Sequence, residues 1–291
     1  MRNGPIAALS SISVGRAERV DRAKKERLRP TSPLGPNGKT LVIAADHAAR
    51  GAMRAGADPL AISDRPELLT RLCAALARPE VNGVLGTADV LEELLLLGAL
   101  EGKTVYGSMN RGGLIGASFE LDDRFTAMSP GAIADSGFEG GKMLLRIDLQ
   151  DAGSVATMEA CARAIDDLSA RGLLVMMEPF MSSRIDGVVR NELTPEAMMR
   201  AIGIASALGS TAANTWLKVP VVDDMARVMA SSTLPSLVLG GEVPQDPDHT
   251  YGTWADALAL PNVHGLVVGR ALLYPSDGDY EAAIDTAVSL L

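Results

Sequence analysis

The sequence predicts an α/β fold, a single (β/α)8 TIM barrel preceded by an N-terminal extension. Three observations favour this fold. The length of 291 residues suits one such barrel. From residue 41 onward, short apolar runs alternate with longer helix-like stretches, which is typical of βαβ units in a parallel sheet. Eight such repeats follow one another, and eight strands close the barrel.

The expected strands are near-continuous runs of Val, Leu, Ile and Met, because parallel strands covered by helices are buried on both faces. In chain order they span residues 41–45, 81–87, 103–109, 142–148, 173–180, 214–220, 236–242 and 265–270. A doubly wound open sheet is the alternative, and it would usually show a glycine-rich dinucleotide turn after its first strand. The sequence there is ADHAARG, so the barrel is favoured.

Several helix starts carry a capping side chain followed by a proline. Residues 129–131 (SPG) and 194–196 (TPE) each place a hydroxyl before a proline suited to the first helical position. Asp64, two residues before Pro66, is a looser version of the same signal. These signals predict helices at three places between the expected strands.

Residues 1–40 lie outside the repeats and are expected to form a basic extension, with residues 41–291 as the catalytic barrel domain. The extension holds nine Lys or Arg and three Asp or Glu, a net charge of +6. Residues 16–30 predict a solvated helix or flexible arm; an RNA-binding arm is less favoured because interleaved aromatic residues are missing. The Pro- and Gly-rich residues 29–38 are expected to link this helix to the first strand.

Charge and hydropathy argue against several classes of partner. The whole chain has a net charge of −9, which leaves −15 after residue 40 and disfavours nucleic acid as the main partner. The most apolar stretch, residues 91–100, is too short for a membrane span and contains two Glu. The N-terminus lacks the features of a secretory signal. Because Cys73 and Cys161 lie in expected helices and form no disulfide framework, we expect a cytoplasmic protein.

Polar residues gather where the expected strands end, and in such barrels the chemistry sits at the carboxyl ends of the strands. From the first strand to the eighth, leaving out the second, they are Asp46 and His47; Ser108 to Arg111; Lys142, Arg146 and Asp148; Glu178; Lys218; Gly240, Gly241 and Glu242; Gly269 and Arg270.

Lys218 stands in TWLKVPVV, an otherwise apolar run that should be buried. A buried lysine loses solvation, which favours the neutral, nucleophilic amine, and a nearby cation such as Lys142 favours it further. The alternative is a lysine paired with a carboxylate inside the barrel. Glu178 is accordingly either an acid/base catalyst or the partner of a barrel lysine. Asp46 either binds or deprotonates a substrate hydroxyl, or caps the following helix.

A phosphate site is predicted after the last two strands. Gly240 with Gly241, and Gly269 with Arg270, occupy the loops that frequently hold phosphate in these barrels. Glycine lets backbone N–H groups approach closely, and arginine adds a charge-assisted contact. A metal centre is not expected, since the chain has only three His, in different kinds of segment. No cofactor is implied.

Together these residues resemble the class I, Schiff-base aldolases that include tagatose-bisphosphate aldolase and the aldolases of inositol breakdown. The resemblance covers residues 41–275 and rests on AADHAARG (44–51), GGKMLLRID (140–148), MEPFM (177–181) and WLKVP (216–220). Two further segments resemble the phosphate loops of archaeal-type class I aldolases: LVLGGE (237–242) and VVGRALLYP (267–275).

The resemblance implies a role for each of four residues. Lys218 would form the Schiff base, Lys142 would tune it, Glu178 would shuttle protons during carbinolamine dehydration, and Asp46 would handle the hydroxyl proton during carbon–carbon cleavage. Arg146 departs from the tagatose enzymes and, with Arg111, suggests a substrate carboxylate besides the phosphate. Pairing of these arginines with acidic neighbours is the alternative, the nearest in sequence being Glu120, Asp122 and Asp148.

The implied substrate is a phosphorylated keto sugar or keto-sugar acid, cleaved without a metal to dihydroxyacetone phosphate and an aldehyde. Similarity to an actinobacterial-type group of inositol catabolism makes 2-deoxy-5-keto-gluconate 6-phosphate a candidate. The alternatives are a deoxyribose-phosphate or other ketose-phosphate aldolase, a barrel isomerase or synthase without an imine, and a sugar-phosphate-binding protein. We expect a homo-oligomer.

Overall fold

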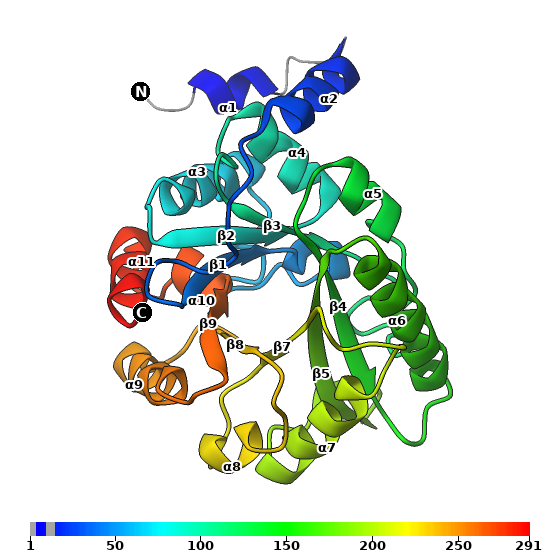
Figure 1. Cartoon of the computed structure of the whole chain (residues 1–291). Helices are drawn as coiled ribbons and strands as arrows, with labels where there is room; N and C mark the ends of the chain where they lie inside the picture. The colour runs from blue at the N-terminus through cyan, green and yellow to red at the C-terminus, as the bar shows by residue number, and fades with distance from the viewer. Residues whose placement is uncertain (1–3, 10–14) are drawn as a thin grey trace.

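The computed structural model describes residues 4–9 and 15–291, and its central feature is a ring of strands surrounded by helices (Figure 1). The barrel strands are hydrogen-bonded in the order β4-β3-β2-β1-β9-β8-β7-β5, and a further pairing of β4 with β5 closes the ring. Every pairing within the ring is parallel. The predicted TIM barrel is therefore confirmed.

The eight predicted strands all occur, within a few residues of the expected bounds. They are β1 (Thr40–Ala45), β2 (Val81–Gly86), β3 (Thr104–Ser108), β4 (Gly140–Ile147), β5 (Leu174–Ile185), β7 (Thr215–Val219), β8 (Ser236–Leu239) and β9 (Val263–Val268). Nearly all of their residues are buried, as expected for strands covered on both faces.

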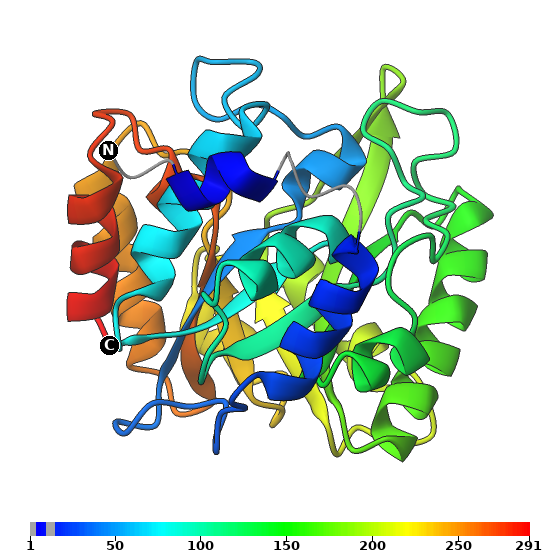
Figure 2. The same ribbon diagram turned by 90° about the horizontal axis from the view of Figure 1, so that it is seen from above.

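The sequence analysis did not predict β6 (Val188–Asn191), which pairs antiparallel with the end of β5. This hairpin turns at Asp186 and Gly187, which both have positive φ angles, 51° and 80°. Asp-Gly is the preferred pair for a two-residue hairpin turn, so the sequence did carry a signal for it. The hairpin extends beyond the ring, among the loops that follow the strands (Figure 2).

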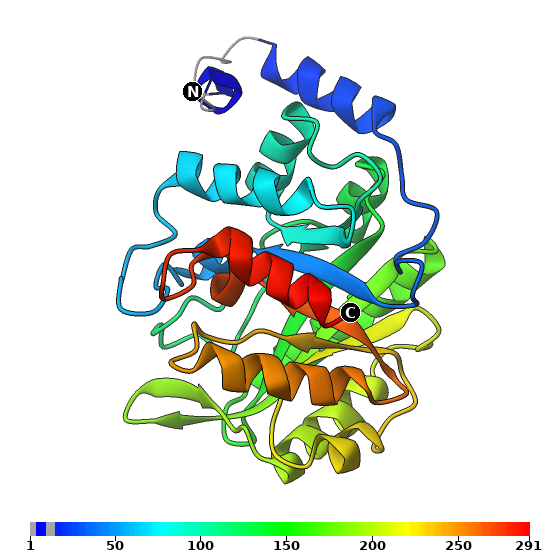
Figure 3. The same cartoon turned by 90° about the vertical axis from the view of Figure 1, so that its left-hand side faces the viewer.

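Helices cover the outside of the barrel (Figure 3). They are α3 (Arg65–Leu76), α4 (Ala88–Leu96), α5 (Pro130–Asp135), α6 (Gly153–Ala170), α7 (Pro195–Ser206), α8 (Met225–Met229), α9 (Pro247–Leu258), α10 (Arg270–Leu273) and α11 (Tyr280–Ser289), with the short 3-10 helix η1 (His47–Arg50) after β1. The three predicted caps are confirmed: Asp64, Ser129 and Thr194 accept hydrogen bonds from the backbone N–H groups of Glu67, Ala132 and Ala197.

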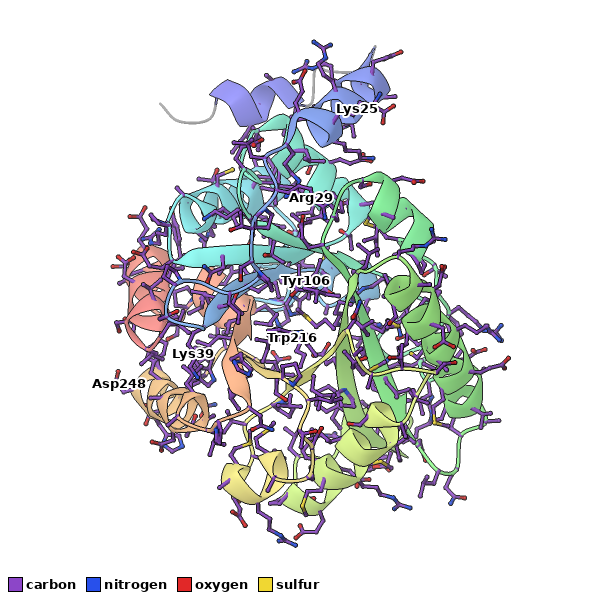
Figure 4. All side chains as sticks on the ribbon, viewed as in Figure 1. Lys25, Arg29, Lys39, Tyr106, Trp216 and Asp248 are labelled. Carbon is purple, nitrogen blue, oxygen red and sulfur yellow. The ribbon has the colours of Figure 1, made fainter. Side chains whose placement is uncertain are left out.

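The amino-terminal half of the barrel interior is filled by side chains. Val42, Tyr106, Met176 and Leu237 pack together there and are almost fully buried. Figure 4 shows Tyr106 and Trp216 inside the ring of strands, whereas Asp248 lies at its periphery on α9. Because this end is filled, space for a ligand is left at the carboxyl end of the strands.

The N-terminal segment folds against the outside of the barrel. It forms α1 (Gly4–Leu9) and α2 (Arg16–Glu26), and the predicted helix is thus confirmed. Arg16 and Lys24 of α2 form ion pairs with Glu93 and Glu92 of α4. The buried Arg27 donates hydrogen bonds to the carbonyls of residues 103 and 137 at 2.9 and 2.5 Å. Part of the positive charge of this segment is therefore paired with acidic groups of the barrel.

Both cysteines lie in helices as expected, Cys73 in α3 and Cys161 in α6, and both are free thiols. Within the described residues, none of the helices has the length and apolar character that a membrane crossing requires.

Candidate active site

A cavity of about 790 Å³ opens at the carboxyl end of the barrel. Its size is typical of small-molecule sites. Every site residue proposed from the sequence lines it: Asp46, Arg111, Lys142, Arg146, Glu178, Lys218, Gly240, Gly241, Gly269 and Arg270. The barrel geometry therefore brings together residues that are spread over more than two hundred positions of the chain.

Glu178 bridges two lysines at the base of this cavity. Its Oε2 lies 2.5 Å from Lys142 Nζ, and its Oε1 lies 2.8 Å from Lys218 Nζ. The three residues come from adjacent strands, β4, β5 and β7. Because Met177 is paired with Leu217, the next residues along, Glu178 and Lys218, lie side by side. All three are buried, so each ammonium faces the carboxylate with little water between them.

Burial and neighbouring charge set the protonation of this cluster. Burial lowers the pKa of Lys142 well below its usual value; Glu178 opposes this shift, and Lys218 and Arg111 add to it. Burial would raise the pKa of Glu178, but Lys142 and Lys218 together lower it below its ordinary range. Glu178 is thus an ionised carboxylate, and the Lys142 amine is driven towards its neutral form.

Asp46 lies at the end of β1 beside this cluster. Its Oδ2 accepts a hydrogen bond from Ser108 Oγ at 3.1 Å, forms an ion pair with Arg111, and lies 3.5 Å from Lys142 Nζ. The alternative role of Asp46 as a helix cap is wrong, because its side chain makes no capping hydrogen bond to η1. Its carboxylate is turned to the cavity cations, where a proton-handling role is chemically feasible.

Two buried arginines hold the long segment between β3 and α5 against the barrel. Arg146 forms an ion pair with Glu120 and donates to its carbonyl at 2.9 Å. Arg50 forms an ion pair with Asp123 at 2.5 Å. Arg146 therefore has the partner considered as its alternative from the sequence, Glu120. Arg111, by contrast, points to Asp46, and burial lowers its pKa to about 10.

The loops after β8 and β9 meet at the opposite wall of the cavity. Gly241 has a φ of +68°, which favours glycine, and a Cβ at Gly269 would lie 2.3 Å from the Ala44 carbonyl oxygen. Arg270 Nη1 lies 2.7 Å from Glu242 Oε1, and the Glu242 side chain is 69% exposed whereas that of Arg270 is 13% exposed. Arg270 is thus held at the cavity wall by an exposed carboxylate, and solvent or an anionic ligand can compete with that carboxylate for Arg270.

His47 lines the cavity next to Asp46. Burial lowers its pKa well below the usual value, and the cations Arg270, Lys218 and Lys142 lower it further. The imidazole is therefore neutral at physiological pH. His264 lies elsewhere, at the amino end of β9, with its ring 5.7 Å from that of Trp216. Across residues 4–9 and 15–291, no three His, Cys, Asp or Glu side chains form a group that could hold a metal.

Sequence reasoning missed two contributors to the site. Arg50 stands in the AADHAARG motif but received no role, and Ser108 was noted only as a strand end. Each acts through a partner from a different segment, Asp123 for Arg50 and Asp46 for Ser108. Arg50 could have been predicted as a site residue, because it is a charged residue close to the end of the first strand. A serine at a strand end carries no comparable signal in the sequence.

The profile of the Cgl0159-like family matches residues 38–288, which is most of the chain. The chain belongs to the Cgl0159-like family. Cgl0159 from Corynebacterium glutamicum (Brevibacterium flavum) shares 47% sequence identity with this chain. Its crystal structure superposes with a TM-score of 0.95 over 98% of this chain and 96% of that one.

More distant structures share the architecture of this Cgl0159-like protein. A Schiff-base-forming fructose-1,6-bisphosphate aldolase superposes with a TM-score of 0.63 and 17% identity, over 93% of this chain and 98% of that one. An archaeal fructose-1,6-bisphosphate aldolase gives a TM-score of 0.62 and 17% identity, over 93% and 97%. At such identity the similarity establishes the shared TIM-barrel fold. No protein of curated function shows significant sequence similarity.

Proposed function

We propose that this protein is a class I aldolase, a carbon–carbon lyase that forms a Schiff base between Lys218 and a ketone. The observation that carries the proposal is the buried carboxylate of Glu178 held between Lys142 at 2.5 Å and Lys218 at 2.8 Å. The distant structural neighbours support it, since one is described as Schiff base forming and another has its catalytic lysine bound to a carbinolamine.

The cluster provides a route for activating the Lys218 amine. Glu178 contacts one lysine with each oxygen, so a proton leaving Lys218 can pass through the carboxyl group to Lys142. Lys142 is suited to receive it, because its pKa is lowered by burial and it is driven towards the neutral amine. Lys218 is then the uncharged nucleophile that attacks the ketone carbonyl.

Glu178 is also placed to assist the following dehydration. Attack gives a carbinolamine, whose hydroxyl leaves as water once an acid protonates it, and the product is a protonated imine. The bridging carboxyl can carry that proton from Lys142 to the departing oxygen.

Asp46 is proposed to act in the cleavage step. Its carboxylate accepts the proton of the hydroxyl two carbons from the imine carbon. The bond between that hydroxyl-bearing carbon and the carbon next to the imine carbon then breaks. Its electron pair forms the enamine, and the hydroxyl-bearing carbon leaves as an aldehyde. Protonation of the enamine and hydrolysis of the imine release dihydroxyacetone phosphate and regenerate the Lys218 amine.

The substrate is proposed to be a phosphorylated keto sugar or keto-sugar acid, with 2-deoxy-5-keto-gluconate 6-phosphate as the candidate. Gly240, Gly241, Gly269 and Arg270 line one wall of the cavity and offer a cation and backbone N–H groups to a phosphate. Arg111 and Arg146 line the other wall and are the proposed cations for a substrate carboxylate, although each also has an acidic partner, Asp46 and Glu120 respectively.

Borohydride reduction in the presence of dihydroxyacetone phosphate, followed by peptide mass spectrometry, tests the proposal. We expect a stable adduct on Lys218 that is absent from Lys218→Met. Lys103→Met is the control, because this lysine is partly buried and donates to backbone carbonyls elsewhere in the fold. Adduct on a different lysine, or none, contradicts the mechanism. Thermal stabilisation by the ligand without an adduct would indicate a sugar-phosphate-binding protein.

A further inference from the structure

Ser108 is the last residue of β3, and its side chain is completely buried beside the proposed reaction cluster. In the parallel register it is paired with Lys142 on β4. Its hydroxyl lies between two charged groups: Oγ is 2.6 Å from Arg111 Nε and 3.1 Å from Asp46 Oδ2. No role for this serine was predicted from the sequence, and it takes no part in the proposed reaction steps.

The directions of these hydrogen bonds are fixed by chemistry. A guanidinium has only donors, so Arg111 Nε–H donates to Ser108 Oγ. The single hydroxyl hydrogen of Ser108 is then left for Asp46 Oδ2, which accepts it. Arg111 also pairs with the same oxygen directly. Arg111, Ser108 and Asp46 therefore form a closed triangle of interactions.

The triangle uses only one oxygen of Asp46. The contacts from Ser108, Arg111 and Lys142 all fall on Oδ2, and within the described part of the chain no hydrogen bond reaches Oδ1. A carboxylate held by one oxygen presents the other in a fixed direction. Oδ1 is therefore the oxygen available to accept a proton from a substrate hydroxyl in the adjoining cavity.

We propose that Ser108 is a positioning residue. It holds Arg111 against Asp46 Oδ2, so that Asp46 Oδ1 faces the substrate hydroxyl that loses its proton during carbon–carbon cleavage. This inference rests on the proposed aldolase function and assigns Ser108 to the carbon–carbon cleavage step alone. The Lys142–Glu178–Lys218 contacts do not include it, so imine formation proceeds without its hydroxyl.

The arrangement also gives the carboxylates of Glu178 and Asp46 different cationic partners. Lys142 Nζ lies 2.5 Å from Glu178 and 3.5 Å from Asp46, so it is committed to Glu178. Once Ser108 no longer holds Arg111 Nε, the guanidinium is free to turn away and Asp46 can approach Lys142 instead. Loss of the hydroxyl is therefore expected to disorient the cleavage base while leaving the nucleophile intact.

The test compares Ser108→Ala with Ser236→Ala. Ser236 is equally buried, on β8, but its hydroxyl binds the Leu234 carbonyl away from the cavity. Three quantities are measured: borohydride trapping with dihydroxyacetone phosphate, the melting temperature, and kcat, KM and the pH profile for condensation of dihydroxyacetone phosphate with the best substrate among a panel of phosphorylated and carboxylated aldehydes.

For Ser108→Ala we expect trapping on Lys218 within about twofold of wild type, an unchanged KM, and a kcat lowered by about 10- to 100-fold. The acid limb of the pH profile should shift, because the hydroxyl that donates to the Asp46 carboxylate has been removed. Ser236→Ala should keep both kcat and the pH profile.

A second variant keeps the inference falsifiable if Ser108→Ala is unstable. Arg111→Lys retains the charge but loses the Nε–H that Ser108 accepts, so by itself it should lower kcat while trapping on Lys218 is preserved. Where Ser108→Ala is stable, the double variant adds a second test. If the two residues act as one unit, the double variant has the kcat of the weaker single variant rather than the product of both losses. Additive losses, or a Ser108→Ala enzyme with wild-type kcat and pH profile, overturn the positioning role. Wild-type protein that forms no adduct overturns the proposed function itself, and this inference with it.

Discussion

Glu178 Oε1 and Lys218 Nζ lie 2.8 Å apart across the neighbouring strands β5 and β7, inside the barrel. The other oxygen of Glu178 is 2.5 Å from Lys142, so one carboxylate balances two amines. Two buried ammonium groups beside one carboxylate leave an unbalanced positive charge, which is costly where water is scarce. The arrangement therefore favours loss of a proton from the pair of lysines, which is what an amine nucleophile requires.

Glu178→Gln removes the carboxylate but preserves its shape. We expect kcat to fall by about 100- to 10,000-fold, because both proton transfer and activation of Lys218 depend on it. The variant should also lose about 3 kcal/mol of unfolding free energy in urea at pH 7, since two buried amines lose their partner. Glu139→Gln, which breaks the buried ion pair with Arg27 on the outside of the barrel, should lose stability but keep kcat. Equal activity losses in the two variants would refute a chemical role for Glu178.

Lys142→Met tests whether this lysine receives the proton from Lys218. We expect the adduct still to form on Lys218, but more slowly at neutral pH. Burial lowers the pKa of Lys142, so its amine is an available proton acceptor, and the variant lacks that acceptor. Trapping is measured as a function of pH by mass spectrometry. Complete loss of adduct together with a normal melting temperature would instead make Lys142 the nucleophile.

Substitutions of Arg270 and Glu242 are expected to change the affinity for an anion in opposite directions. Arg270→Met should weaken binding of inorganic phosphate by about 10- to 100-fold, the value of a charge-assisted hydrogen bond. Glu242→Gln should tighten it several-fold, because Glu242 occupies Arg270 at 2.7 Å and competes with the ligand. Both constants are obtained by isothermal titration calorimetry at fixed ionic strength. Unchanged affinity in Arg270→Met would place the phosphate elsewhere in the cavity.

Much of this fold was accessible from the sequence because parallel barrel strands are apolar on both faces. A charged residue inside such a run is therefore conspicuous, and Lys142, Glu178 and Lys218 were found in this way. The closure of the barrel then places them on neighbouring strands. The sequence did not predict which carboxylate pairs with each cation, because these pairs depend on loops that are far apart in the chain.

Arg146 and the β5–β6 hairpin illustrate the limit. From the sequence, Arg146 was equally expected to bind substrate or to pair with an acidic neighbour. The fold of the segment after β3 brings Glu120 to Arg146, and the two form an ion pair. The hairpin was missed because Val188–Asn191 is short and its residues are partly or fully exposed, so it lacks the apolar run that marks the other strands. Arg27 was hidden likewise, since only the folded arm buries it among backbone carbonyls.

His47 predicts a pH dependence of stability. Its pKa is lowered well below 6.5 in the folded protein, so below pH 6.5 the unfolded chain binds a proton that the native imidazole does not. Stability therefore falls as the pH drops from 7.5 to 5.5, by about 1 kcal/mol from this group alone. In His47→Asn this contribution should vanish, giving a smaller loss of unfolding free energy over the same interval in urea. Above pH 7.5 the two proteins should show the same slope, because the imidazole is neutral in both states. Parallel curves across the whole range would mean that His47 takes up its proton equally well in the folded state.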